Sequence, residues 1–437
     1  MEWWLILFIF LGALIFLLAT GLPVAFAFFL INIVGAILFL GGPLGLRQMT
    51  LSIFNGLTTF TLAPVPLFVF MGEILFHSGM AIKTLDVVDK WMGRLPGRLS
   101  LLTVIGGTIF SNLSGSTMAN TAMLGSLMVP AMSSRGYSKT MSLGPILGTG
   151  GIAMIIPPSA LAIVLGTLAH ISIGKLLLAG IFPGLLMAAL YFSYIILRCR
   201  INPSLAPAYE VSEVSLRSKV VDLFKYVVPL STIVFLVVGL IFLGIATPTE
   251  AAAMGSVGAI GLAGTYRRLS LQTIVKAMKG TLKVTVMTFM IIAGSTTFSQ
   301  LLAFSGATRG MVEFVTSLPL SPIMVLIAMQ IILILLGAFM EQISMMMVSV
   351  PIYMPIVNAL GFDSVWFGIL MLINLEIAFT TPPFGLLLFV MKGVAPPDTT
   401  MDDIYRAALP FIICDLIAMA IIMSFPSIAI WLPNLMK

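Results

Sequence analysis

Small polar residues gather at two places in the first half of a sequence that is otherwise strongly apolar. The first is Ser111 to Ser116, Ser-Asn-Leu-Ser-Gly-Ser, at the centre of the uncharged stretch 99–134. The second runs from Thr149 to Ser159, where Thr-Gly-Gly is followed by a Pro-Pro pair. Glycine, proline and hydroxyl residues at membrane depth are tolerated where the backbone lines a protein-enclosed cavity. Hydroxyl, amide and unwound carbonyl oxygens are hard, neutral ligands for a dehydrated Na+.

A second set of polar residues follows the same pattern in the other half of the chain. Glu341, Gln342 and Ser344 interrupt the apolar stretch 321–358, and the run 374–383 reads Asn-Leu-Glu-Ile-Ala-Phe-Thr-Thr-Pro-Pro. Glu376 lies between Asp363 and Lys392, near mid-membrane. An acid at that depth is a functional candidate by default. A structural carboxyl that is protonated or hydrogen-bonded is the alternative for Glu376 and for Glu341.

Two such interrupted elements facing each other predict an ion and substrate site. Small-residue helix packing, which also uses Gly, Ser and Thr, is the alternative for the first set. The predicted Na+ ligands are Ser111, Asn112, Ser114, Gly115, Thr149, Gly150, Gly151, Glu341, Ser344, Thr380, Thr381 and Pro382. The predicted substrate-binding residues are Ser114, Ser116, Asn120, Ser344, Asn374 and Thr381.

The composition identifies a polytopic, all-α membrane protein. Apolar residues make up 59% and charged residues 9% of the 437, against roughly 45–50% and about 25% in soluble domains. The net charge of +6 and the pI of about 9.4 are typical of basic cytoplasmic loops, and no basic run with interleaved aromatics suggests nucleic-acid binding. With only Cys199 and Cys414, neither a disulfide framework nor a cysteine metal site is expected.

Apolar runs of about 20 residues, the length that spans a bilayer, organise the chain. The stretches 99–134 and 321–358 are expected to form re-entrant helical hairpins instead of spans. Two stretches are expected to be broken helices. The first, 140–171, is expected to be broken around Thr149 to Ser159 and unwound already at Thr149, Gly150 and Gly151, and the second is 364–391. The runs expected to cross the membrane lie near 3–19, 22–41, 60–79, 140–171, 176–197, 226–245, 248–265, 284–304, 364–391 and 405–431.

The distribution of basic residues predicts the orientation of these spans. If residue 1 is outside and each hairpin returns to its own side, only Arg47, Lys175, Arg309 and Lys437 lie outside, and the other Lys and Arg face the cytoplasm. Basic residues concentrate in cytoplasmic loops, so we expect both termini to be periplasmic. The first hairpin then enters from the cytoplasm and the second from the periplasm.

The two halves of the chain echo each other on either side of the polar connection from Cys199 to Lys225. Glu73 to Gly79 matches Gln300 to Gly306, Pro130 matches Pro355, and Pro157-Pro158 matches Pro382-Pro383, all at nearly one spacing. In the predicted topology, matching elements run in opposite directions. An inverted repeat with interrupted helices is typical of secondary transporters.

The placement of charge constrains how an anion could be held. No Lys or Arg occurs in 99–134, 140–174, 284–308 or 310–391. An anion between the hairpins must therefore be neutralised by helix N-termini and by co-bound cations. This couples anion binding to Na+ binding and gives symport a physical basis.

Three local patterns have mainly structural interpretations. Thr247-Pro-Thr-Glu250 is expected to begin a helix, with Thr247 as its cap. Glu73 can pair with His77 one turn later. The basic segments 83–98 and 267–283 are amphipathic and are expected to lie on the cytoplasmic leaflet as interfacial helices.

These motifs resemble the large membrane subunit of tripartite ATP-independent periplasmic (TRAP) transporters. The resemblance rests on the Ser-Gly-Ser hairpin, on Gly150-Gly151 through Ser159, on Thr247 to Ala253, and on Asn374 to Ile377 with Thr381 to Pro383, and it covers nearly the whole chain. It implies Na+-driven import of a small organic carboxylate, such as a C4-dicarboxylate or sialic acid, across the bacterial inner membrane. It implies two Na+ sites, one at Ser111 to Ser116 with Thr149 to Gly151, and one at Glu341 to Ser344 with Thr380 to Pro382. It also implies two partners, a small four-helix membrane subunit and a soluble periplasmic binding protein. No four-helix stretch precedes Trp3, so the small subunit is expected to be a separate chain.

The resemblance further implies an elevator mechanism, in which the hairpins and broken helices move against a scaffold. Scaffold and an interfacial helix are expected over 1–98, the first hairpin and broken helix over 99–171, and further scaffold, the connecting loop and an interfacial helix over 172–283. A scaffold helix with a periplasmic connection follows over 284–320, the second hairpin and broken helix over 321–393, and a last scaffold helix over 394–437.

Three other functions compete with this interpretation. A single-component Na+/carboxylate symporter needs no binding protein. An intramembrane enzyme would use Ser114 or Ser116 as nucleophile and His77 or His170 as base, yet neither histidine lies in a hairpin. An ion channel would need an open pore, whereas paired hairpins are suited to closing over a ligand. We therefore expect a transporter and not an enzyme.

Overall fold

The structure is a computed structural model that describes residues 2–93, 95–114, 117–207, 215–337, 340–383 and 385–436. Within those ranges every regular element is a helix, which confirms the all-α prediction. The first half contains α1 (Trp3–Ala19), α2 (Val24–Phe39), α3 (Pro43–Leu57), η1 (Phe60–Leu62), α4 (Pro64–His77), α5 (Met80–Trp91), α6 (Arg98–Ser114), α7 (Thr117–Ser133), α8 (Lys139–Ile155), α9 (Ala160–Leu168), α10 (Ile173–Ala179), α11 (Ile181–Ile201) and η2 (Pro203–Leu205).

The second half repeats much of this order of long and short helices. It contains α12 (Leu216–Asp222), η3 (Leu223–Val227), α13 (Val228–Phe242), α14 (Pro248–Thr265), α15 (Leu271–Phe304), α16 (Ala307–Ser317), α17 (Pro322–Gly337), α18 (Gln342–Ala359), α19 (Ser364–Thr380), α20 (Leu386–Val394), α21 (Met401–Ser424) and α22 (Ser427–Asn434).

Membrane-spanning helices are present, as the composition predicts. Six of the described helices are long and apolar enough to cross a bilayer, or seven if α8 and α9, bent by 47°, count as one span. Helices such as α1, α2 and α19 are apolar but shorter, so length alone does not qualify all ten predicted runs. Gln342–Ala359, expected as one arm of a hairpin, is itself long enough to qualify.

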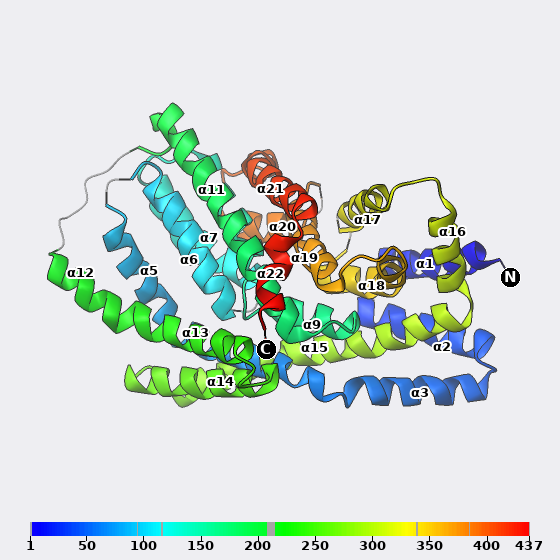
Figure 1. Cartoon of the computed structure of the whole chain (residues 1–437). Coiled ribbons are helices and arrows are strands. Elements are labelled where there is room, and N and C mark those ends of the chain that lie inside the picture. Colours follow the sequence, from blue (N-terminus) through cyan, green and yellow to red (C-terminus); the bar gives the residue numbers. More distant parts are fainter. Residues whose placement is uncertain are drawn as a thin grey trace.

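The predicted hairpin stretches each form two helices in contact. Stretch 99–134 contains α6 and α7, and stretch 321–358 contains α17 and α18. Figure 1 shows α6 and α7 on one side of the molecule and α17 and α18 on the other, with α19 to α21 between them. The repeat of element order matches the internal repeat in the sequence, while its inversion and the elevator motion stay predictions.

The break in the first broken helix lies later than the sequence suggested. Thr149, Gly150 and Gly151 are inside α8, which continues to Ile155, so the prediction that the helix is unwound at these three residues is wrong. The chain leaves the helix only between Ile156 and Ser159, at the Pro-Pro pair. These glycines have no side chain, so neighbouring helices can pack closely against α8 at this point.

The segments expected as interfacial helices differ from the prediction in extent. The first forms α5, which ends at Trp91. The second does not form a separate helix, because α15 runs without interruption from Leu271 to Phe304. Gln, Lys and Leu, which fill much of residues 271–283, are good helix formers, so the apolar span extends into the basic segment.

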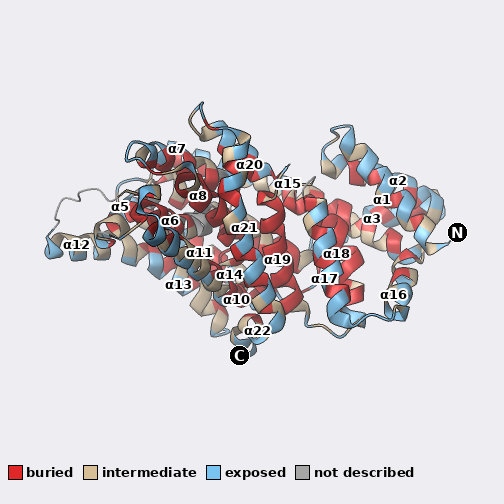
Figure 2. Ribbon diagram, turned by 90° about the horizontal axis from the view of Figure 1, so that it is seen from above, coloured by how far each residue is buried: buried red, intermediate tan, exposed pale blue. Residues whose placement is uncertain are grey.

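Helix α8 lies at the centre of the packing. It contacts α6, α7, α11, α19 and α21, and its residues from Met141 to Ile155 are buried. In Figure 2 the buried residues gather along α8, α18 and α19, while the outer helices carry exposed faces. The polar residues of α8 and α19 are therefore enclosed by protein and not by lipid.

Two local predictions are confirmed. Thr247 caps α14 in a capping box, in which its hydroxyl accepts from the Glu250 amide at 3.3 Å and the Glu250 carboxylate accepts from the Thr247 amide at 2.7 Å. The imidazole of His77 lies 3.1 Å from the carboxylate of Glu73.

A half-buried ion pair fixes the first hairpin to α5. The Arg98 guanidinium, 4% exposed, donates to the Asp89 carboxylate at 2.9 Å and to the Asp89 carbonyl at 2.7 Å. We expect Arg98→Ala to lower the stability of the purified protein by about 2 kcal/mol, because it removes the hydrogen bonds that the charged guanidinium donates to Asp89, a residue that stays partly solvated. Thermal unfolding in detergent measures this. Lys83→Ala removes an exposed pair of 3.9 Å and is the control; an equal loss in both variants would contradict the assignment.

Candidate functional site

Three consecutive residues of α8 each contact a different helix. A methyl group placed on Gly107 of α6 would lie 2.5 Å from the Thr149 hydroxyl. One placed on Gly150 would lie 3.0 Å from the Thr121 hydroxyl of α7, and one placed on Gly151 would lie 1.6 Å from the carboxyl carbon of Glu376 on α19. Glycine permits this approach because it has no side chain. The first hairpin and the second broken helix therefore meet α8 at this point.

The first hairpin contributes amide and hydroxyl groups to this contact. Asn120, fully buried, donates to the Gly107 carbonyl at 3.5 Å. Thr149 donates to the Pro145 carbonyl of its own helix at 2.6 Å. The hydroxyl of Thr121, also fully buried, has no hydrogen-bond partner among the described residues. Its oxygen is thus available to a ligand, although sequence reasoning did not select this residue.

Part of the tip of the first hairpin lies outside the described residues. Gly115 and Ser116, predicted as Na+ and substrate ligands, lie outside the described residues. Ser111, Asn112 and Ser114 lie in the last turn of α6. Their side chains lie outside the described part of the structure. The structure places their backbone at the hairpin end, as predicted, and their ligand roles stay predictions.

Ser159 links the two halves of the first broken helix. Its hydroxyl donates to the Met154 carbonyl at 2.5 Å and accepts from the Ala162 amide at 3.1 Å. Ser159 is the N-cap of α9. The first turn of α9 therefore faces the break, with the positive end of the helix dipole toward it.

The second hairpin holds the second broken helix through a buried amide pair. Asn374 of α19 donates to both the backbone carbonyl and the side-chain carbonyl of Gln330 on α17, each at 2.8 Å. Its own Oδ1 has no partner in the described part of the chain. The same holds for the hydroxyl of Ser344 on α18, which is fully buried. Asn374 and Ser344, both predicted as ligands, thus have side-chain oxygens without a hydrogen-bond partner among the described residues.

The tip of the second hairpin contacts both broken helices. A methyl group on Gly337 would lie 2.1 Å from the Ala378 methyl at the end of α19. Gln342 donates to the Met154 sulfur, next to the first break, at 3.1 Å. Glu341 is the N-cap of α18, makes no side-chain capping bond, and its carbonyl accepts from the Met345 amide.

The second break begins where the sequence predicts it. Thr380 is the last residue of α19 and Thr381 is its C-cap, followed by Pro382. Both threonine hydroxyls donate to carbonyls of their own helix, Thr380 to Glu376 at 3.1 Å and Thr381 to Ile377 at 2.5 Å. Their oxygens keep a lone pair for a cation. Leu386 then begins α20.

Comparison with known proteins decides the family. The family model described as the DctM component of tripartite ATP-independent periplasmic transporters matches residues 11–428. This chain belongs to that family. It is a TRAP transporter large subunit, as the motifs of the two hairpins and breaks suggested, and a multi-pass membrane protein.

Several curated TRAP large permeases are similar over nearly their full length. A C4-dicarboxylate TRAP large permease of Pseudomonas aeruginosa is 32% identical, with 90% of each chain covered. A sialic acid TRAP large permease of Vibrio cholerae is 31% identical, with 96% of each covered. A 2,3-diketo-L-gulonate TRAP large permease of Escherichia coli is 31% identical, with 93% of each covered.

Two solved transporters share the fold of this TRAP subunit. The YdaH transporter of Alcanivorax borkumensis superposes with a TM-score of 0.62 at 14% identity, covering 88% of this chain and 89% of its own. The MtrF structure of Neisseria gonorrhoeae gives 0.58 at 15% identity, covering 87% and 84%. At these identities the likeness concerns the fold alone.

The TRAP subunit also buries an acidic residue that sequence reasoning missed. Asp415 of α21, 1% exposed, accepts a hydrogen bond from Tyr191 of α11. It lies close enough to Glu376 for the two carboxyls to interact electrostatically. The carboxyl of Glu376 lies against the backbone of Gly151 on α8. An acid within the apolar run 405–431 was the available signal.

The arrangement in this TRAP subunit is suited to a small cation and an anion together. Buried oxygens of Thr121, Ser344 and Asn374 lack partners in the described ranges, and an unpaired buried polar group costs free energy that a bound ligand recovers. Helices α9 and α20 begin at the two breaks, where their N-termini favour negative charge.

Proposed function

We propose that this chain is the Na+-coupled membrane subunit that imports a small organic carboxylate. The observation that carries the proposal is the set of buried, unpartnered oxygens on the hairpins and on the second broken helix, those of Thr121, Ser344 and Asn374, in segments that contain no Lys or Arg. Such oxygens suit a cation, and a cation supplies the positive charge that an anion there requires.

The carboxylate class follows from the relatives and from the electrostatics together. The relatives named above are described as transporters of a C4-dicarboxylate, of sialic acid and of 2,3-diketo-L-gulonate, and all three substrates are carboxylic acids. A carboxylate between the hairpin tips would accept hydrogen bonds from backbone N–H groups in the first turns of α9 and α20. Substrate contacts are proposed for Ser114, Ser116, Asn120, Ser344, Asn374 and Thr381.

Na+ binding is proposed at two positions. The first uses the tip from Ser111 to Gly115 with Thr149 to Gly151, and Thr121 adds a hydroxyl beside Gly150. The second uses Glu341, Ser344, and Thr380 to Pro382. Because these segments contain no Lys or Arg to neutralise an anion, each Na+ lowers the energy of the anion, and the anion in turn strengthens Na+ binding by the same factor.

We propose an elevator motion of the hairpins and broken helices against the scaffold. An apolar cavity of about 360 Å³ separates α1 from the second hairpin, where Leu7, Leu11 and Leu14 face Val348, Ile352 and Ile356. Apolar surfaces impose few directional bonds, so they can slide without breaking specific contacts. The scaffold is proposed to contact a small four-helix subunit in the bacterial inner membrane, with both termini of the chain periplasmic.

Omitting the binding protein tests the tripartite assignment. Proteoliposomes containing the chain and its small subunit are supplied with succinate or sialic acid in a Na+ gradient, with or without the cognate periplasmic binding protein. We expect uptake only when the binding protein is present. Equal uptake without it would replace this proposal with the single-component Na+/carboxylate symporter.

A further inference from the structure

A groove on the surface of the scaffold has features that the transport mechanism does not use. It lies between α4 and α15 and has a volume of about 620 Å³. Its walls are apolar apart from Lys279 and two threonines. They comprise Pro66, Leu67 and Phe70 of α4, and Val275, Met278, Lys279, Thr281, Leu282 and Thr285 of α15.

One side of the groove is basic along its length. Lys276, Lys279 and Lys283 recur at helical spacing along α15, which places them along one side of the helix. All three are exposed, and none forms an ion pair with a residue that the structure describes. The nearby carboxylate of Glu73 packs against Gly280 and pairs with His77 instead. The positive charge along this side is therefore available to a ligand.

The rest of the α15 wall is apolar and contains one unused hydroxyl. Thr285 lines the groove, and its buried hydroxyl has no partner within the described residues. It lies six residues beyond Lys279, about 9 Å further along the helix. Because Leu282 and Met278 on the same helix are strongly exposed, this wall is open to an apolar partner.

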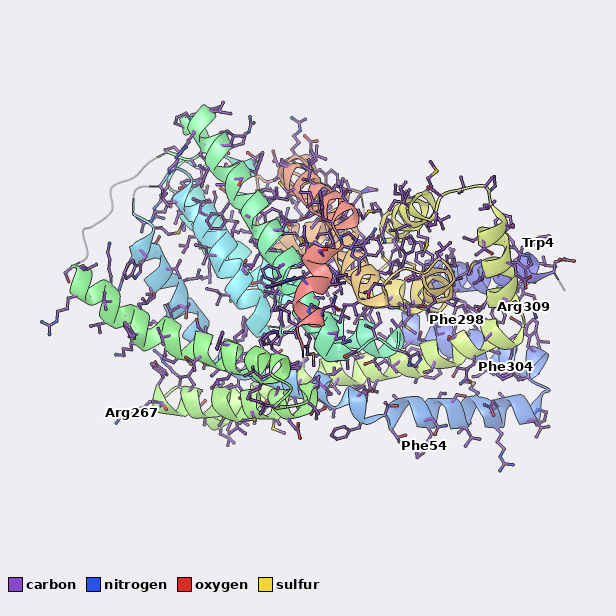
Figure 3. All side chains as sticks on the ribbon, in the orientation of Figure 1. Trp4, Phe54, Arg267, Phe298, Phe304 and Arg309 are labelled. Carbon is purple, nitrogen blue, oxygen red and sulfur yellow. The ribbon has the colours of Figure 1, made fainter. Side chains whose placement is uncertain are left out.

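The three lysines belong to a part of α15 that the sequence predicts to lie on the cytoplasmic side. Arg267, at the end of α14, and Arg309, on α16, lie at opposite ends of the molecule, and Phe304 at the end of α15 lies near Arg309 (Figure 3). The lysines follow Arg267 in the first half of α15. The cytoplasmic leaflet is the one in which anionic lipids attract basic juxtamembrane residues.

We propose that this groove binds an anionic phospholipid. The phosphate lies against Lys276, Lys279 and Lys283, an ester carbonyl accepts from Thr285, and an acyl chain fills the apolar wall between Phe70 and Leu282. Charge complementarity favours this occupant. A protein helix about 10 Å across would need roughly 1,300 Å³ over three turns, about twice the volume of the groove.

Native mass spectrometry of the full-length chain tests the proposal. The protein is purified in detergent and titrated with phosphatidylglycerol or with phosphatidylcholine of the same acyl chains. We expect tighter binding of phosphatidylglycerol. Replacing the three lysines by serine should reduce that affinity by about fivefold for each lysine, while phosphatidylcholine binding changes little.

Two further variants separate the groove from general charge. The control Arg200→Ser, Arg217→Ser, Lys219→Ser removes the same charge on the predicted cytoplasmic side and should keep phosphatidylglycerol bound. Leu282→Trp fills the groove, retains the lysines, and should weaken both lipids. Equal loss in the control, or unchanged binding in the lysine and Leu282→Trp variants, would overturn the proposal. Displacement of the lipid by the small subunit, with no lipid retained in the complex, would also overturn it and assign the groove to that subunit.

Discussion

Gly151→Ala should reduce uptake at least tenfold, because it places a methyl group where the Glu376 carboxyl lies. That methyl group would stand 1.6 Å from the carboxyl carbon of Glu376 and 2.1 Å from one of its oxygens. Glu376 is fully buried, so it cannot move into solvent, and overpacking at such a site forces α8 and α19 apart. The shift would displace Gly150 from Thr121 and so distort the predicted first Na+ site. Initial uptake rates in proteoliposomes measure the effect.

Two variants show whether the contact itself is responsible. In Gly239→Ala the new methyl group has no neighbour within 4 Å, and uptake should stay at the wild-type level. Shortening the opposing residue, in Gly151→Ala with Glu376→Ala, relieves the overlap and should recover part of the folded protein seen by size-exclusion chromatography. Wild-type uptake by Gly151→Ala would show that the two broken helices are not held together here.

Ser344→Ala should raise the Na+ concentration for half-maximal uptake by about tenfold to a hundredfold, the loss expected when a charged ligand loses one oxygen partner. The Ser344 hydroxyl has no partner within the described chain, so its removal should not lower the thermal stability of the Na+-free protein. The Na+ dependence of uptake and thermal unfolding with and without Na+ measure the two effects.

Ser349→Ala is the matched control for this prediction. Ser349 is on the same helix and is also buried, but its hydroxyl donates to the Met345 carbonyl at 2.6 Å. We expect its Na+ dependence to equal that of the wild type. If Ser344→Ala shifted the Na+ dependence no more than Ser349→Ala does, Ser344 would be excluded as a ligand.

Apolar periodicity and polar interruptions predicted the helical elements well. The stretches 99–134 and 321–358 each form a helix pair, and the second break falls at Thr380 to Pro382 as expected. These features depend on local signals, namely the length of an apolar run and the position of proline. The predicted unwinding at Gly150 and Gly151 was wrong, because the need for a side-chain-free surface against Thr121 and Glu376 depends on partners that are distant in sequence.

The contacts that complete the candidate site could not be predicted in the same way. Gln330 binds Asn374, and it stands in an apolar helix whose sequence gives no partner. Thr121 is one of several hydroxyl residues near the tip, and only its packing against Gly150 distinguishes it. Asp415 was detectable as an intramembrane acid, whereas its hydrogen bond with Tyr191 required the tertiary structure.

Parallel measurement of Na+ and substrate entry tests the central claim most directly. Proteoliposomes containing the chain and its small subunit receive radiolabelled Na+ and radiolabelled substrate in the presence of the binding protein. We predict that substrate accumulates only with an inward Na+ gradient and that Na+ enters with it in a fixed ratio. Accumulation that persists when K+ replaces Na+ on both sides, or that follows a proton gradient instead, would contradict the account.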